Sequence, residues 1–147
     1  MYTGLLHTHS SLRYIILLLM VVVLAKSMVG LINNKPFEKI DGKFSLWLMI
    51  AAHIQLVVGL ALYGVSPVVR FGADTMKDSI LRYWAVEHVV IMLIAVVLIT
   101  LARTSTKRLT LDSAKHKRVF LLTGISLLLI VLAIGMSGRG IIIPVRA

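Results

Sequence analysis

The sequence contains no cysteine among its 147 residues. This absence excludes disulfide bonds, thiolate-ligated iron–sulfur clusters, cysteine-rich zinc sites and the C-x-x-C-H attachment of covalent c-type haem. The sequence also lacks a glycine-rich nucleotide loop and the nucleophile elbow of hydrolases. Histidine is therefore the residue type left to ligate a metal or a haem iron. We expect a non-catalytic carrier or accessory subunit rather than an enzyme with chemistry of its own.

Acidic residues are few, with 6 Asp and Glu against 16 Lys and Arg and a formal net charge of +10. The basic residues fall mostly in short clusters between apolar runs, which is the usual arrangement at the flanks of membrane spans. A nucleic-acid surface would need a continuous basic face with interleaved aromatic residues, and the sequence shows none. We therefore expect membrane lipid, and no nucleic acid, around this chain.

Hydrophobic residues make up 59% of the chain, and the mean hydropathy is +0.94. Both values exceed what the surface of a water-soluble domain tolerates. Four apolar segments each approach the roughly 20 residues that cross a bilayer. These segments run from Leu5 or Tyr14 to Ile32, from Phe44 to Val65, from Ile80 to Leu101, and from Val119 to about Ser137. Because lipid permits only helices or closed barrels, and no strand pattern is present, residues 1–147 are predicted to form one all-α domain, a membrane-embedded antiparallel four-helix bundle.

The basic residues are divided unequally between the two ends of this expected bundle. Nine lie in the loops after the first and third segments: Lys35, Lys39, Lys43, Arg103, Lys107, Arg108, Lys115, Lys117 and Arg118. Six lie at the opposite end: Arg13, Arg70, Lys77, Arg82, Arg139 and Arg146. Because basic loops stay in the cytoplasm, we expect a multi-pass protein of the bacterial inner (cytoplasmic) membrane with both termini non-cytoplasmic. The N-terminal residues lack the pattern of a signal peptide, so the first segment is expected to be retained.

Lys26 fixes the depth of the first segment. A lysine can extend to the interface from a turn or two inside the membrane, so the inner edge is expected near Lys26 to Gly30 and the outer edge near Leu5. This placement puts His9 and Arg13 in the outer leaflet. We expect Lys26 to lie at the cytoplasmic interface and not against a buried carboxylate.

The third segment carries Glu87 and His88 side by side. An ionisable residue inside a membrane is costly, and it therefore usually faces a partner, a cofactor or a water-filled path. Adjacent residues of a helix point about 100° apart, so Glu87 is not expected to ligate the same metal as His88. We expect Glu87 to form a salt bridge with Arg13 or Arg82; a hydrogen bond to another imidazole and proton handling are the alternatives.

Two histidines that face each other at one depth could hold a haem between them. His9 and His88 meet this condition if the first and third segments lie diagonally in a four-helix ring. His53 is closer to His88 in depth but comes from the preceding segment. A second haem between His53 and His116 would have to bridge a depth difference of roughly 15 Å. Arg13 lies at i, i+4 from His9, where it could meet a haem propionate.

Four short motifs around these histidines resemble those of known membrane proteins. HTHSSLR opens the first segment, HIQLVVGLALY lies in the second, EH in the third, and KHKR opens the fourth. With this layout the chain resembles the small bacterial four-helix membrane proteins called cytochrome b, and more distantly a b561-type bundle or one half of a haem A synthase. The resemblance implies one or two haem b groups ligated by His9, His53, His88 and His116. Glu87 directly precedes His88, whereas the synthases place a glutamate a turn before a histidine, so synthase activity is not carried over.

We therefore expect an integral membrane haem b protein that transfers electrons. The partners considered are quinone, other subunits of a respiratory or other membrane complex, and a second copy of the chain. Two alternatives stay open: a non-redox structural or assembly subunit, and a small proton pathway through Glu87, His88 and His53. His7 is expected to be an interfacial residue without a ligand role.

Overall fold

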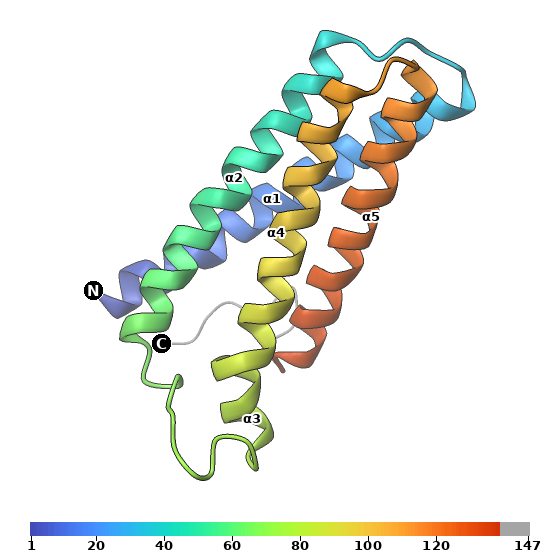
Figure 1. Cartoon of the computed structure of the whole chain (residues 1–147). Helices are drawn as coiled ribbons and strands as arrows, with labels where there is room; N and C mark the ends of the chain where they lie inside the picture. The colour runs from blue at the N-terminus through green and yellow to red at the C-terminus, as the bar shows by residue number, and fades with distance from the viewer. Residues whose placement is uncertain (139–147) are drawn as a thin grey trace.

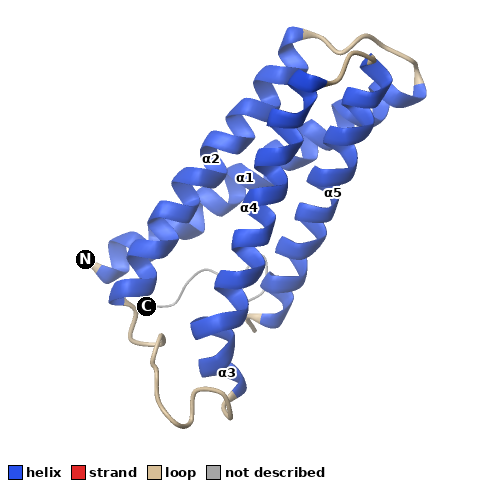
Figure 2. Cartoon of the chain, viewed as in Figure 1, coloured by secondary structure: helices blue, strands red, loops and turns tan. Residues whose placement is uncertain are grey.

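The computed structural model describes residues 1–138. Over this range the chain is helical without any strand, and four long helical rods lie antiparallel (Figure 1, Figure 2). The elements are α1 Tyr2–Ile32, α2 Lys39–Val65, α3 Ser79–Arg82, the π-helical turn η1 Tyr83–Glu87, α4 His88–Thr104, the 3-10 turn η2 Ser105–Arg108, and α5 Asp112–Met136. The elements α3, η1, α4 and η2 form one continuous rod. The predicted all-α four-helix bundle is confirmed for the described part of the chain.

The four rods form a ring. Helix α1 packs against α2 and α5, and α4 packs against the same two helices. The first and third rods are therefore diagonal, as the pairing of His9 with His88 requires. The α1–α2 loop and the turn before α5 lie at one end of the bundle, while the N-terminus and the α2–α3 connection lie at the other (Figure 1). Arg139 and Arg146, which were counted above for the orientation, lie outside the described residues.

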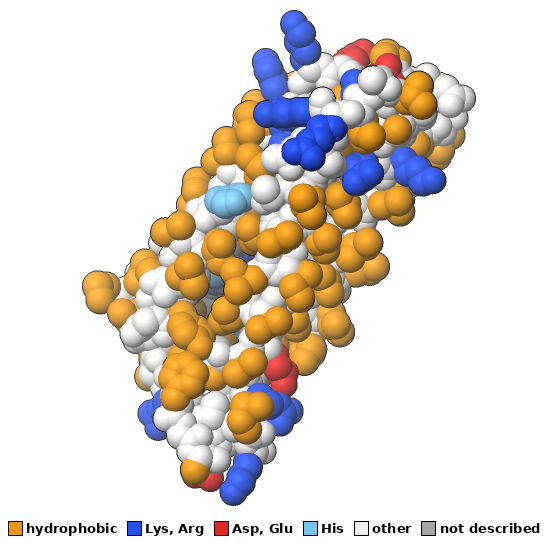
Figure 3. All heavy atoms as spheres, in the orientation of Figure 1, with side chains coloured by type: hydrophobic (Ala, Val, Ile, Leu, Met, Phe, Trp, Pro, Cys, Tyr) orange, Lys and Arg blue, Asp and Glu red, His pale blue; other side chains and the backbone are white. Residues whose placement is uncertain are grey.

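All four rods are long and apolar enough to cross a membrane. Apolar side chains cover the middle of the molecule, and Lys and Arg side chains gather at its two ends (Figure 3). Leu18, Val57 and Leu128 on three different helices are each about two-thirds exposed. A continuous apolar surface of this kind is unfavourable in water and suits helices that face lipid.

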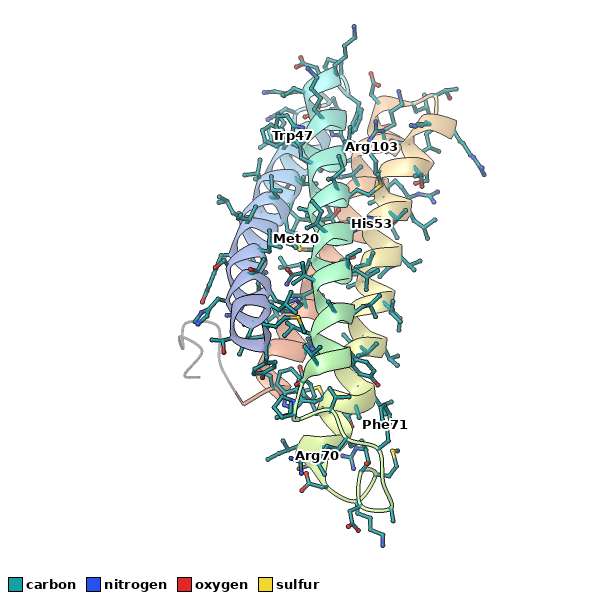
Figure 4. All side chains as sticks on the ribbon, turned by 90° about the vertical axis from the view of Figure 1, so that its left-hand side faces the viewer. Met20, Trp47, His53, Arg70, Phe71 and Arg103 are labelled. Carbon is teal, nitrogen blue, oxygen red and sulfur yellow. The ribbon has the colours of Figure 1, made fainter. Side chains whose placement is uncertain are left out.

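Apolar side chains from all four rods pack together in the core of the bundle. Met20, Leu48, Ile99 and Val119 are almost completely buried and pack together. Met20 lies about halfway along α1 (Figure 4).

Lys26 faces a carboxylate at the basic end. Its Nζ lies 3.1 Å from Oδ1 of Asp41, whose side chain is only 11% exposed. Asp41 also accepts a hydrogen bond from the backbone N–H of Glu38 at 2.9 Å, as part of a capping box at the start of α2. Lys26 therefore does not pair with Glu87, and the half-buried carboxylate that it meets belongs to the first turn of the next helix.

Gly30 makes room for an imidazole where α1 meets α5. A Cβ at this position would lie 2.5 Å from Nε2 and 2.6 Å from Nδ1 of His116, far inside contact distance. The His116 ring is buried and packs edge-on against Phe37 with 5.0 Å between the ring centroids. The two helices can therefore approach this closely only with glycine at position 30.

Replacing Gly30 with alanine should destabilise the bundle. The added methyl group must displace the His116 ring from a packed site, an overpacking cost of about 1–3 kcal/mol. Thermal or denaturant unfolding in detergent micelles measures the change. Gly4→Ala is the matched control on the same helix, because a Cβ there meets nothing within 4 Å. Equal stability of the two variants would contradict the close contact.

Candidate functional site

A cavity of about 190 Å³ lies inside the bundle, in the half toward the N-terminus. All four rods contribute to its wall, which is mainly apolar. Its ionisable and hydrogen-bonding side chains include His9, Arg13, Gln55, Tyr63, Tyr83 and His88. A buried apolar space with a few convergent polar groups is the usual form of a cofactor or ligand site.

His9 and His88 face each other from the two diagonal rods. Their ring centroids are 6.4 Å apart and the ring planes are inclined by 65°. Both residues line the cavity. Of the histidines expected to bind haem, these are the two that the structure brings together.

Two residues of α2 hold His9 in place. The Nε2 of Gln55 donates a hydrogen bond to the backbone carbonyl of His9 at 2.9 Å. One turn later, Gly59 lies against the imidazole, and a Cβ there would be 3.2 Å from Cε1. The Nδ1 of His9 is buried and has no hydrogen-bond partner among the described residues. A buried polar atom without a partner is costly, so this nitrogen is a candidate for binding a ligand that the protein alone does not supply.

His88 follows directly on the π-helical turn η1. A π turn closes at i+5, so it brings residues five apart onto one side of the rod. Tyr83 Oη accordingly lies 3.2 Å from Nδ1 of His88, and Arg82 Nε donates to Oε1 of Glu87 at 2.6 Å. The predicted salt bridge of Glu87 is confirmed with Arg82 as its partner. The adjacent Glu87 and His88 thus have separate partners, as expected from their different directions.

Two tyrosines link the third rod to its neighbours beside the cavity. The hydroxyl of Tyr83 donates to the backbone carbonyl of Ala133 in α5. The hydroxyl of Tyr63 in α2 donates to the carbonyl of Ala85 within η1 at 2.7 Å. Sequence reasoning missed both tyrosines as well as Gln55. The available signal was that each is a hydrogen-bonding residue within an apolar segment, where it needs a partner.

Arg13 lies one turn beyond His9 on the cavity wall. Its Nη2 donates to the hydroxyl of Tyr14 at 3.2 Å, and its guanidinium lies 5.0 Å from the centre of that ring. Its Nε is buried and without a hydrogen-bond partner in residues 1–138. An acidic group bound beside His9 would therefore meet a cation that still has a buried donor to offer.

The remaining histidines lie elsewhere. His53 is exposed on the outer surface of α2, with Nδ1 2.8 Å from the carbonyl of Met49 (Figure 4). His116 is buried between α5 and α1 at the basic end. The structure therefore does not bring His53 and His116 together as a facing pair, and neither lines the cavity. His7 is exposed.

Metal binding by side chains alone has no candidate in residues 1–138, where no three His, Asp or Glu groups are clustered suitably. Haem makes a smaller demand on the protein. Its porphyrin supplies four ligands to the iron, so that two axial histidines complete the coordination.

No known protein family matches this chain, and neither a curated protein nor a solved structure is detectably similar to it. The chemistry of the cavity residues is therefore the basis on which a function can be proposed.

Replacing Gly59 with alanine should displace the His9 ring by a few tenths of an ångström. The new Cβ at 3.2 Å from Cε1 is tighter than normal contact, and the imidazole can move into the cavity to relieve it. The His9 ring signals in NMR spectra of histidine-labelled protein report the shift. Gly64→Ala, also on α2, adds a Cβ that meets nothing within 4 Å and should leave these signals unchanged. Unchanged His9 signals in both variants would contradict the contact.

Proposed function

We propose that this chain is a multi-pass membrane protein that binds one haem b between His9 and His88 and carries electrons within the membrane. The spacing of 6.4 Å between the two ring centroids supports this most directly. With metal–nitrogen bonds of about 2 Å and ring centres about 1 Å behind each nitrogen, two axial imidazoles on one iron have centroids about 6 Å apart. The helices already hold the two rings at this separation.

The wall of the cavity also suits a porphyrin. Ala52, Gly59 and Ala95 line it with little or no side chain, so a flat group could approach the helix backbones closely there. Trp84 and Met92 add apolar surface from the third rod. The proposal assigns Arg13 to a haem propionate, because its buried Nε is a donor without a partner in the described structure.

Haem bound in this way would supply a reversible one-electron change of its iron. The chain would contribute two neutral imidazoles and an apolar surrounding that excludes water, and these set the reduction potential. An electron carrier of this kind would exchange electrons with quinone or with a neighbouring subunit of a larger respiratory or other membrane complex.

A second candidate is a structural or assembly subunit without redox chemistry. It is favoured by the polar groups that join the rods directly, namely the tyrosine hydroxyls on the carbonyls of Ala85 and Ala133. The proton pathway considered from the sequence has less support, because Glu87 is engaged by Arg82.

A visible spectrum of protein expressed with abundant haem distinguishes the two candidates. The wild type should show a low-spin spectrum with a sharp reduced α-band, and His9→Ala and His88→Ala should each lose it because one axial ligand is gone. His53→Ala is the matched control, since this imidazole lies on the outer surface of α2. A wild type that binds no haem would favour the structural subunit. An unaltered spectrum in a well-inserted His88→Ala protein would refute the ligand assignment.

We also propose that the end of the bundle with the α1–α2 loop and the turn before α5 faces the cytoplasm of a bacterial cell, which leaves both chain termini outside it. Support comes from the nine Lys and Arg residues in and next to these connections, most of them in the adjoining helix ends.

Single cysteines test this orientation, because the natural chain has none to react in the background. Thr110 lies before α5 and Asp74 lies between α2 and α3, and both are exposed. A membrane-impermeant maleimide added to intact spheroplasts should label Asp74→Cys and should label Thr110→Cys only after lysis. The reverse pattern would invert the orientation and leave the bundle unaffected.

A further inference from the structure

The hydroxyl of Tyr83 lies within hydrogen-bond distance of a backbone carbonyl, which can only accept, and of an imidazole nitrogen, which can donate or accept. It donates to the carbonyl of Ala133, and it lies 3.2 Å from Nδ1 of His88. A tyrosine hydroxyl has one proton, and a carbonyl can only accept. Because that proton is directed to Ala133, the second hydrogen bond must run from Nδ1–H of His88 to the Tyr83 oxygen.

The position of the proton decides what His88 can bind. A neutral imidazole with its proton on Nδ1 carries its lone pair on Nε2, and that nitrogen can then ligate a metal. We infer that Tyr83 is a positioning residue that fixes His88 in the iron-binding Nδ1–H tautomer. This inference rests on the proposed haem site and adds to it the group that prepares one of the two ligands.

The π turn is what makes this contact possible. In a regular α-helix, positions 83 and 88 would point about 140° apart. The turn Tyr83–Glu87 closes at i+5 and puts the tyrosine hydroxyl beside the imidazole. Trp84 also packs against His88, with 5.3 Å between the ring centroids, and its ring contacts that of Tyr83 at 4.8 Å, so the three rings form one cluster.

A hydrogen bond of this type also changes the strength of the ligand. An acceptor on Nδ1–H draws the proton away from the ring and makes Nε2 a better electron donor to a metal. A better donor favours the ferric state, so the Tyr83 oxygen should lower the reduction potential of a bound haem. Loss of such an outer hydrogen bond typically reduces metal affinity by about 10–100-fold.

Tyr83→Phe removes the hydroxyl and keeps the ring. In haem-free protein with 15N-labelled histidine, the His88 ring nitrogens of the wild type should show the Nδ1–H form, and those of the variant a mixture of tautomers. In haem-loaded protein, the variant should bind haem about 10-fold more weakly and show a higher midpoint potential.

Ser126→Ala is the control. It also removes a buried hydroxyl that donates to a backbone carbonyl across helices, but its bond goes to Ala95 and its side chain does not line the cavity. It should lower stability by a similar amount and leave both the His88 tautomer and the midpoint potential unchanged. Wild-type values in Tyr83→Phe, or equal shifts in both variants, would overturn the inference. The wild type could also fail to bind haem while the His88 tautomer still changes in Tyr83→Phe. That result would refute the haem function but support the Tyr83–His88 hydrogen bond.

Discussion

Polar groups inside this bundle must find their partners within it, because an apolar surrounding offers none. Most of them do so locally. Thr100, Thr104 and Ser126 each return their hydroxyl to the carbonyl four residues earlier, and Arg82 closes on Glu87. The exceptions are informative. In the described structure, six buried polar side-chain atoms have no hydrogen bond. Three of them border one cavity, namely Nδ1 of His9, Nε of Arg13 and Oε1 of Gln55, and the other three belong to Arg103, His116 and Thr123 outside it. The three that share the cavity are the physical reason for proposing a ligand in this space.

Two histidines of the bundle pack on a glycine of a neighbouring helix, with different consequences. His116 lies against Gly30 and fills its site, with Phe37 at one side of the ring. His9 lies against Gly59 but faces the cavity and His88. The same small residue thus serves close helix packing in one case and the placement of a candidate ligand in the other. Position in the bundle distinguishes the two roles, since a histidine and a glycine alone would look identical in the sequence.

The sequence determined the architecture well because hydropathy and loop length suffice for four antiparallel helices. Lys26 indicated the depth of α1 in the membrane. From that depth we could predict that His9 and His88 face each other across the diagonal. The orientation of His53 could not be obtained in this way. Helix α2 carries apolar residues on every side, as a lipid-facing helix does, so periodicity does not tell which side is inside. The partner of Lys26 was also missed, because Asp41 belongs to a helix start that lies beyond the apolar run.

The π turn was the largest omission, and it changes how the third rod should be understood. Apolar patterning over about 20 residues is nearly the same with or without one wider turn, so no count of periodicity detects it. The local sequence nevertheless contains the groups that benefit from it. Arg82 and Glu87, and Tyr83 and His88, are both separated by five positions, and each pair meets only when the helix closes at that interval. Two favourable contacts formed by one turn offset the poorer hydrogen-bond geometry of the π-helix. The same turn places His88 beside His9 and beside the Tyr83 hydroxyl, so one local departure from the α-helix sets both the neighbour and the hydrogen bond of this imidazole.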